Sequence, residues 1–242
     1  MFKFLKNIMN NEEVNLTNDA YSLHRILKTD IQKDPDVYED EIFFGCGCFW
    51  GSEKCFWKLP GVITTSVGYA GGKKNNPTYY EVCSGLTGHS EVVRVIWDKR
   101  EIDVSDLLKM FWECHDPTQK NRQGNDMGTQ YRSAIYYKNE NNIKTILASK
   151  EQYQTELSKK NHGLIETEIK MIDSYFYAEQ YHQQYLASAG SRQYCSASPT
   201  KVKLGVFTGS NYKLEDHIWE NFNWEVDKCV LRSDNNPIKN NI

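Results

Sequence analysis

Residues 45–51, which read GCGCFWG, constrain the fold of this chain more than any other stretch. Residues 41–44 lead into it and have the composition of a strand, whereas residues 52–58 after it have the pattern of a helix. The glycines allow the backbone to turn sharply between these two elements. The sequence therefore predicts that Cys48 lies at a strand-to-helix turn, directly before the helix.

Strand and helix patterns are intermixed along the rest of the chain. Further strands are predicted at residues 62–69, 91–97, 131–137 and 165–171, and further helices at residues 104–114, 143–160 and 177–186. This order has no regular alternation of strand and helix, so it favours the α+β class over a doubly wound parallel sheet. We predict a two-layer mixed α/β sandwich with a ferredoxin-like core and irregular N- and C-terminal extensions.

The length of 242 residues suits one sizeable domain with tails and is short for two domains. We expect residues 1–37 to be a loosely held N-terminal extension, residues 38–194 to be the folded domain, and residues 195–242 to be a C-terminal tail. Aromatic side chains of the tail are expected to pack over the domain. The final stretch NNPIKNNI, residues 235–242, is expected to be disordered.

Composition excludes several classes of protein. The net charge of −3 and the absence of Lys and Arg clusters argue against nucleic acid as a partner, and no apolar run approaches the length of a membrane span. The first residues, MFKFLKNIMNN, lack the features of a secretory signal, so we expect a cytoplasmic protein. A short amphipathic helix or a weak mitochondrial presequence remains an alternative there. The odd number of seven cysteines favours reduced thiols over a disulfide framework.

Cys48 is a candidate nucleophile because of its predicted place before a helix. Free N–H groups at a helix N-terminus stabilise a thiolate and lower the thiol pKa from its ordinary value of about 8.5. Phe49 and Trp50 would line an apolar pocket beside the sulfur. Such a pocket suits a substrate that carries an alkyl group next to its reactive centre.

Three other interpretations of the thiols remain open. In the simplest, Cys46, Cys48 and Cys55 are small buried hydrophobic residues. A zinc site is the second, although the CxC spacing lacks a second CxxC or HxxxH pair and the six histidines are scattered. A papain-like hydrolase that uses His182 is the third. Its cysteine pattern is out of register by one residue, and His182 lies among tyrosines at helical spacing, where packing is the simpler role.

Polar residues further along the chain could complete a site. Glu91 begins an apolar strand, and a desolvated carboxyl group there can keep its proton at neutral pH, although a solvated Glu is the simpler interpretation. Residues 115–128 form a long polar loop, and long loops in compact domains are commonly functional. Asp126 in this loop and Tyr131 at the start of the strand after it are the candidate hydrogen-bonding groups, but neither can be told from an ordinary turn Asp or half-buried Tyr by itself.

Taken in order, four motifs of the chain resemble those of the A-type peptide methionine sulfoxide reductases: GCFWG, GYAGG, PTYYEVCSGLTGHSEVVRV and HDPTQKNRQGNDMGTQYRSAIY. The resemblance runs from about residue 43 to residue 185 and includes EQYHQQYL. It implies a thiol-dependent oxidoreductase that reduces methionine S-sulfoxide, free or peptide-bound, and so repairs oxidised proteins. It also implies that residues 38–194 form the catalytic domain, that no metal or organic cofactor is needed, and that a monomer is recycled by thioredoxin.

The resemblance implies a role for each site residue. Cys48 would be the nucleophile, with Phe49 and Trp50 forming the pocket for the substrate methyl group. Glu91 would protonate the sulfoxide oxygen, since a sulfoxide is a poor electrophile until its oxygen is protonated or strongly hydrogen-bonded. Attack would leave a sulfenic acid on Cys48, which a second thiol can condense to a disulfide. Hydrogen-bonding support would come from Tyr79, Asp126 and Tyr131.

The resolving thiol is where the chain departs from the family pattern. Many relatives carry this thiol in a glycine-rich tail with the sequence GYCG, whereas here only Tyr194 and Cys195 remain, within SRQYCSAS. Cys195 is the first candidate to resolve the sulfenic acid, and Cys229 is a candidate to pass the disulfide on. Cys46 is a rival, but its CxC spacing to Cys48 would strain a direct disulfide.

Overall fold

A six-stranded sheet lies at the centre of the computed structural model, which describes residues 22–226 and 229–240. Its strand order is β7-β6-β1-β3-β2-β8. Every neighbouring pair is antiparallel except β6 and β7, which are parallel. The predicted α+β class is therefore confirmed, with a mixed sheet. The strands are β1 (Glu39–Cys46), β2 (Val62–Ala70), β3 (Ser90–Asp98), β6 (Ser133–Tyr137), β7 (Glu168–Met171) and β8 (Tyr175–Tyr177).

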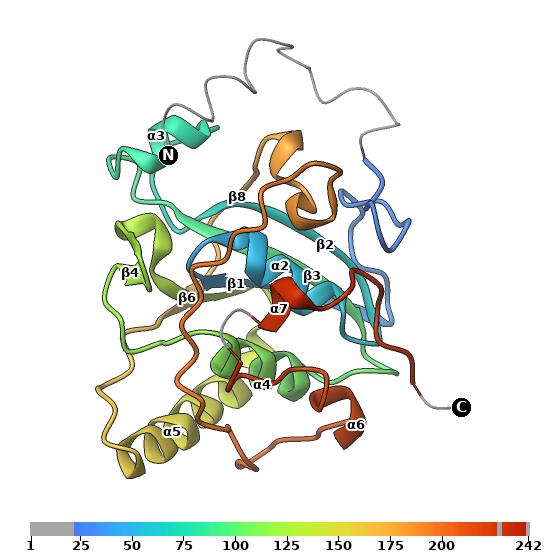
Figure 1. Cartoon of the computed structure of the whole chain (residues 1–242), viewed down its shortest axis with the longest axis vertical. Coiled ribbons are helices and arrows are strands. Elements are labelled where there is room, and N and C mark those ends of the chain that lie inside the picture. The colour runs from blue at the N-terminus through green and yellow to red at the C-terminus, as the bar shows by residue number, and fades with distance from the viewer. Residues whose placement is uncertain (1–21, 227–228, 241–242) are drawn as a thin grey trace.

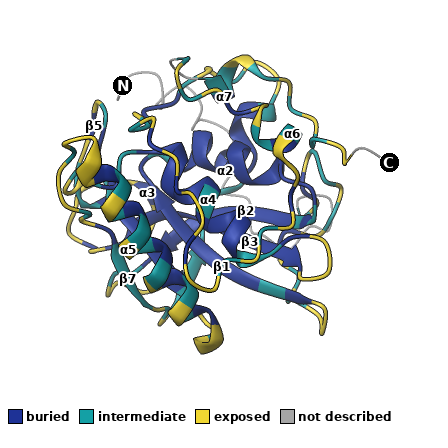
Figure 2. Ribbon diagram, turned by 90° about the horizontal axis from the view of Figure 1, so that it is seen from below, coloured by how far each residue is buried: buried dark blue, intermediate teal, exposed yellow. Residues whose placement is uncertain are grey.

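Helices α2 (Phe49–Trp57) and α4 (Val104–Cys114) lie on one face of the sheet, and α5 (Ile143–Lys159) packs against α4 (Figure 1). Every residue of α2 is buried, which Figure 2 shows as a helix coloured dark blue throughout. Two short strands, β4 (Arg122–Gln123) and β5 (Asp126–Met127), form a separate hairpin. The predicted helix at residues 104–114 is confirmed to the residue, because Asp103 closes a capping box at its start.

The core is divided between the two faces of the sheet. The larger cluster lies between the sheet and helices α2 and α4, and it includes stacked rings of Phe44, Phe56 and Phe111. A smaller cluster on the opposite face includes Phe43, whose ring packs against Tyr175. Residues 43 and 44 point to opposite faces because side chains alternate along a strand. The site therefore begins on a strand and a helix that are both fixed by the core.

The predicted helix at residues 177–186 is wrong. The segment instead contains the end of β8 and two 3₁₀ turns, η4 (Gln180–His182) and η5 (Tyr185–Ala187). Gln184 between the turns has a left-handed backbone with φ 46°. The buried carboxylate of Glu53 on α2 holds it there, accepting hydrogen bonds from the Gln184 backbone N–H at 2.8 Å and its side-chain amide at 2.7 Å. The helical spacing of the tyrosines carries no information about this contact, because Glu53 lies on a helix far away in the sequence.

The short helix α3 (Tyr79–Cys83) was not predicted, although Thr78 and Glu81 form a capping box at its N-terminus. The N-terminal segment is irregular as expected, but its described part is not loosely held. His24 is fully buried, and its Nε2 hydrogen-bonds Thr65 Oγ1 of β2 at 2.9 Å. The proposed presequence or amphipathic helix lies in residues 1–21, outside the described residues.

The C-terminal tail packs over the domain, as predicted, and adds the short helices α6 (Asp216–Trp219) and α7 (Cys229–Arg232). α7 lies against α2, visible in Figure 1 as the red helix in front of it. Side chains of α2 and its C-cap bind the chain beyond α7: Lys54 Nζ donates to Ser233 O, Trp57 Nε1 to Asn235 O, and Lys58 Nζ to Asn236 O.

The prediction of disorder at the C-terminus is therefore wrong for residues 235–238, because backbone groups of that stretch are held by α2; Ile238 N–H donates to Lys58 O at 2.9 Å. Residues 241–242 lie outside the described part. Within the part of the chain that the structure describes, no helix is both long and apolar enough to cross a bilayer.

Candidate active site

Cys48 occupies the N-cap position of α2, directly after β1, as predicted. The turn needs glycine before it, because Gly47 has φ +89° and a Cβ atom there would lie 2.5 Å from Cβ of Gln123. The Cys48 side chain is half-buried beside the backbone N–H of Trp50, but it makes no side-chain capping hydrogen bond. The local fold thus aims a thiol at the free N–H groups that begin a helix.

The expected lowering of the Cys48 pKa is not found. Burial and the nearby Glu91 carboxylate raise the pKa of this thiol well above its ordinary value, against the opposing effect of the Trp50 N–H. The pKa is raised because the cost of desolvating the Cys48 thiolate outweighs the favourable effect of the N–H groups at the helix N-terminus. The resting site therefore holds Cys48 as a neutral thiol.

Glu91 is the second residue of β3 and is 2% exposed. Its Oε2 accepts a hydrogen bond of 3.1 Å from the backbone N–H of Phe49, the residue after Cys48. Burial raises its pKa to about 8, and the charges of Asp126 and Glu179 act in the same direction. Glu91 therefore carries a proton at neutral pH beside the start of α2, as the sequence suggested.

The three supporting polar residues also lie around Glu91. Burial first, and then the charge of Glu91, raise the pKa of both Tyr79 and Tyr131, so both hydroxyls stay protonated and can donate hydrogen bonds. The Tyr79 hydroxyl is hydrogen-bonded with Cys83. Asp126 accepts a hydrogen bond of 2.6 Å from the Tyr194 hydroxyl through Oδ1, while its buried Oδ2 has no hydrogen-bond partner among the described residues. The structure thus brings the predicted residues into one polar site.

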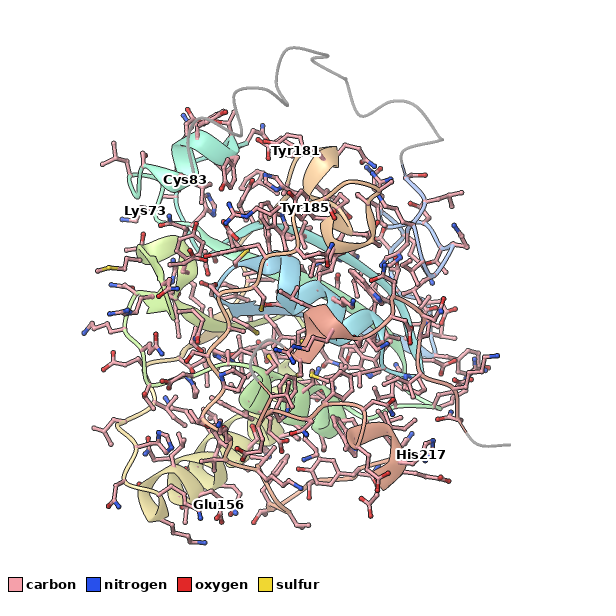
Figure 3. All side chains as sticks on the ribbon, viewed as in Figure 1. Lys73, Cys83, Glu156, Tyr181, Tyr185 and His217 are labelled. Atoms are coloured by element: carbon pink, nitrogen blue, oxygen red, sulfur yellow. The ribbon has the colours of Figure 1, made fainter. Side chains whose placement is uncertain are left out.

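Aromatic rings form the other wall of the site. Trp50 stacks on Tyr185 with ring centroids 3.8 Å apart, and its Nε1 donates to His182 Nδ1 at 3.0 Å. Phe49 lies 5.1 Å from the His182 ring. Figure 3 places Tyr181 and Tyr185 in the same half of the molecule as Cys83, away from Glu156 and His217. These contacts hold the two residues after Cys48 in a fixed apolar arrangement.

His182 does not act as the partner of a cysteine nucleophile. Burial lowers its pKa to about 3, and its Nδ1 is occupied by the Trp50 indole. The packing role suggested by the sequence is therefore supported, with the addition that His182 fixes the orientation of Trp50. This arrangement removes the basis of the papain-like alternative, which needs a histidine base beside the thiol.

Cys195 lies against the first turn of α2. A Cβ atom added at Gly51 would lie 2.5 Å from Cys195 Sγ, so the sulfur touches the bare backbone three residues after Cys48. The Cys195 charge also raises the pKa of Cys48, which requires the two thiols to be near each other. The preceding residue, Tyr194, packs edge-on against the Trp50 ring with centroids 6.4 Å apart. The C-terminal tail thus reaches the site at Cys195, the first candidate for the resolving cysteine.

Cys229 is near Cys195 rather than near Cys48. Burial raises the Cys229 pKa to about 12, and the charges of Cys55 and Cys195 act in the same direction. Cys195 and Cys229 both line a small cavity of about 20 Å³ beneath α2. In the part of the chain that the structure describes, the cysteines are in the thiol form and are not joined in disulfides.

Cys46, Cys114 and His115 offer one possible group of metal ligands, with their ligand atoms within 4.8 Å of one another. Both ring nitrogens of His115 are already hydrogen-bonded, Nδ1 to Phe111 O at 2.7 Å and Nε2 to Ser133 Oγ at 2.8 Å. Only two thiols then remain, whereas a structural zinc site takes four ligands. The residues present do not fit a zinc ion.

Comparison with known proteins decides the family. The model of the family described as peptide methionine sulfoxide reductase matches residues 40–212. The chain belongs to this family. Among its relatives, the reductase MsrA of Vibrio vulnificus is 53% identical over 74% of this chain and 86% of its own length. That of Azotobacter vinelandii is 56% identical over 68% of this chain and 76% of its own length.

Solved structures agree with this assignment. Methionine sulfoxide reductase A of Corynebacterium diphtheriae is 38% identical, covers 80% of this chain and 99% of its own, and superposes with a TM-score of 0.65. The reduced form of Mxr1 from Saccharomyces cerevisiae is 32% identical, covers 67% of this chain and 92% of its own, and gives a TM-score of 0.60. The reductase described here is thus of the A type, a peptide-methionine (S)-S-oxide reductase.

Several residues at the site of the reductase were not predicted from the sequence as part of it. They are Gly51, Glu179, His182, Tyr185 and Tyr194. Glu179 accepts hydrogen bonds from the Tyr69 hydroxyl and from the backbone N–H of Tyr79, both at 2.8 Å, and so ties α3 to the sheet. The motif EQYHQQYL contains three of the five and could have pointed to them, but its tyrosine spacing suggested a helix.

Proposed function

We propose that this reductase reduces methionine S-sulfoxide, peptide-bound or free, through a sulfenic acid on Cys48, and so repairs oxidised proteins. Cys48 forms a bond to the substrate sulfur, the sulfoxide oxygen is transferred to the Cys48 sulfur, and methionine leaves. The two electrons that reduce the sulfoxide come from the thiol, and the sulfenic acid retains the oxygen. No other oxidant or reductant takes part in this half-reaction.

The observation that carries the proposal is the buried Glu91 carboxyl beside the N-cap thiol, whose Oε2 accepts a hydrogen bond of 3.1 Å from the Phe49 N–H. In the proposed mechanism this carboxyl protonates the sulfoxide oxygen and makes the sulfur electrophilic. Cys48 and Glu91 both start neutral, so the proton that Cys48 loses replaces the proton that Glu91 gives to the sulfoxide oxygen. The hydroxyls of Tyr79 and Tyr131 are assigned to hold the oxygen, with Asp126 in the supporting network.

Phe49 and Trp50 are assigned to bind the methyl group next to the substrate sulfur. Trp50 is suited to this role because Tyr185 stacks on one side of it and His182 fixes its indole N–H. A rigid apolar wall lets the pocket accept the methyl group while the polar side accepts the oxygen. This division of the site between one apolar and one polar substituent is the basis of selectivity for one sulfoxide epimer.

For recycling, we assign Cys195 as the thiol that condenses with the Cys48 sulfenic acid, releasing water and forming a disulfide. Cys229 then exchanges with Cys195, and an external dithiol of the thioredoxin class reduces the product. The contact of Cys195 with Gly51 and the cavity that it shares with Cys229 support this order. Cys229 is also only partly buried, so it is the thiol of this pair that an external dithiol can reach.

We also infer that the domain at residues 38–194 has a ferredoxin-like core. The support is the order β1, α2, β2, β3, α4, β6 along the chain, with the four strands antiparallel in the spatial order β6-β1-β3-β2. Both helices of this unit cover one face, which gives the predicted two layers. Residues 195–242 then act as the tail that carries both resolving thiols.

The first test of the function uses separated S and R epimers of N-acetyl-methionine sulfoxide with dithiothreitol as reductant. The expected result is methionine from the S epimer alone, measured by chromatography, and none from Cys48→Ser. Turnover by Cys48→Ser would remove Cys48 from its role. If neither epimer reacts with the wild type, the site would bind methionine sulfoxide without reducing it.

The second test concerns Cys195. In Cys195→Ser, about one equivalent of methionine should still form per enzyme, because Cys48 can be oxidised without a resolving thiol. Turnover driven by thioredoxin should fall sharply, since no disulfide forms for it to reduce. Coupled NADPH oxidation with thioredoxin and its reductase measures this loss, and an unchanged rate would transfer the resolving role to another thiol such as Cys46.

A further inference from the structure

The cysteines of this chain are concentrated beneath one helix. The cavity under α2 is lined by four of them, two of which have no part in the proposed recycling. Cys55 projects from α2, and Cys114 ends α4. The four cysteines around the cavity are Cys55, Cys114, Cys195 and Cys229.

Cys55 and Cys114 line the same cavity of about 20 Å³ from the packed helices α2 and α4. The sulfurs of Cys114 and Cys46 of β1 also lie within 4.8 Å of each other. Cys55 and Cys114 are almost fully buried, with exposed fractions of 3% and 2%. A disulfide between these two residues requires their sulfurs to approach to about 2.05 Å across this small cavity.

The Cys55–Cys114 pair and the Cys195–Cys229 pair both line the cavity. Charges of Cys195 and Cys55 both raise the pKa of Cys229, and the charge of Cys195 also raises that of Cys114. Of the four sulfurs, only Cys229 belongs to a residue that is not fully buried. An oxidising equivalent can therefore reach Cys55 and Cys114 through Cys195 and Cys229, while solvent thiols cannot reach them directly.

We propose that Cys55 and Cys114 form a second redox site, an internal store of two electrons that the resolving thiols draw on. The proposal rests on the proposed function of Cys48, Cys195 and Cys229. Cys55 attacks the Cys195–Cys229 disulfide and forms a mixed disulfide with Cys195, and Cys229 leaves as a thiolate that takes up a proton. Cys114 then attacks the Cys55 sulfur and releases Cys195. Cys55 and Cys114 are oxidised, and Cys195 and Cys229 are reduced, without any external reagent.

This exchange is slow at neutral pH. Interaction with Cys114 and burial raise the pKa of the Cys55 thiol, and the attacking species in exchange is the thiolate. The pair therefore acts as a store that is used when external reductant is scarce, and the reduction of substrate with plentiful thioredoxin does not depend on it.

The number of methionines formed without reductant tests the proposal. The fully reduced enzyme, freed of dithiothreitol, is incubated with excess S sulfoxide for hours, and methionine is counted per enzyme. Transfer to Cys195 and Cys229 alone allows about two equivalents, because Cys48 ends as a sulfenic acid after the second. One further disulfide at Cys55 and Cys114 raises the count to about three.

The expected result is about three equivalents for the wild type and about two for Cys55→Ala and for Cys114→Ala. Cys46→Ala is the matched control, because Cys46 is equally buried and lies near Cys114 but does not line the cavity. It should keep the wild-type count. Mass spectrometry after alkylation should find the Cys55–Cys114 disulfide in the exhausted wild type.

Dithiothreitol-driven turnover distinguishes a failure of the electron store from a failure of the proposed function. It should be equal in the wild type and all three variants, since this reductant reaches Cys48 without the store. A wild-type count of two with normal dithiothreitol turnover would overturn the store and leave the function intact. So would a count of three in Cys55→Ala. Absent dithiothreitol turnover in the wild type would instead overturn the proposed function.

Discussion

At the scale of single residues, the site is built from two groups that each hold a proton at neutral pH. Burial raises the pKa of Cys48 well above its ordinary value and raises the pKa of Glu91 to about 8. A neutral carboxyl costs less to bury than an ionised one, so the resting site avoids an uncompensated negative charge. The proposed role of Glu91 as the acid for the sulfoxide oxygen requires this neutral form.

Glu91→Gln should lower kcat by about 10²- to 10⁴-fold, the usual contribution of a positioned general acid. The amide oxygen can still accept the Phe49 N–H, so the fold should be kept, which circular dichroism can check. Wild-type kcat across the pH range in this variant would show that another group supplies the proton.

The pH dependence of kcat/KM tests the same proposed role of Glu91. In the wild type, Glu91 is active in its protonated form, so kcat/KM should fall as the pH rises through about 8. This limb of the profile should be absent from Glu91→Gln, because an amide does not titrate. A limb that persists unchanged in the variant would assign it to another group.

At the scale of elements, α2 organises the molecule. Cys48 is its N-cap, Gly51 contacts Cys195, Glu53 holds Gln184, and Lys54 binds the C-terminal chain at Ser233 O. One buried helix thus connects the sheet, the aromatic wall and the tail, and Figure 1 shows α2 between the strands of the sheet and α7 of the tail. A disturbance of α2 affects substrate binding and recycling together, whereas a change at its contact with the tail affects recycling alone.

Gly51→Ala separates these two effects. Alanine favours a helix by about 1 kcal/mol over glycine, so α2 itself should be kept. The added Cβ would lie 2.5 Å from Cys195 Sγ, so the tail must move away. Thioredoxin-driven turnover should fall by about tenfold or more, as expected when a reacting group is displaced by an ångström. Dithiothreitol-driven turnover should change little, and an equal loss in both assays would contradict the role given to this contact.

The sequence predicted the elements that depend on local interactions and missed those that depend on contacts between residues far apart in the chain. The helix at residues 104–114 was predicted correctly because its apolar periodicity is local, as is the capping box that the structure shows at its start. The segment around Gln184 was not, because its backbone is set by Glu53, 131 residues away in the chain. In the site, Cys48 and Glu91 were found through motifs, but the thiol cluster depends on how the tail packs and has no local pattern.

At the scale of the whole molecule, buried ionisable groups set the response to pH. Burial lowers the pKa of His24, His115 and His182 to about 3, 4 and 3. The unfolded chain binds protons at these histidines below about pH 6.5, while the native state does not. Their contribution to the free energy of unfolding therefore decreases as the pH falls, by up to about 1.4 kcal/mol per pH unit for each histidine.

Glu53 and Glu91 act in the opposite direction. Burial raises their pKa to about 7 and about 8, so the native state binds more protons than the unfolded chain between about pH 4.3 and those values. Above about pH 4.3 the two carboxyl groups partly offset the three histidines. Below it the histidines are joined by Glu81 and Asp98, whose pKa values are lowered to about 2 by hydrogen bonds from Lys74 and Arg100, respectively. Thermal unfolding followed by circular dichroism should show a steep loss of Tm below about pH 4. A constant Tm down to pH 3 would contradict the neutral state of the three histidines.

The contact between Cys195 and Gly51 also bears on how long the oxidised enzyme survives. Because the tail is already folded against α2, the conformational entropy of bringing the second sulfur close is lost during folding and not during the reaction. Condensation with the proposed sulfenic acid is then unimolecular, with a high effective concentration of thiol. A short-lived sulfenic acid has little time to be oxidised further to a sulfinic acid, a step that is not readily reversed. The packing of the tail would thus protect the enzyme from the same oxidants whose damage to methionine it reverses.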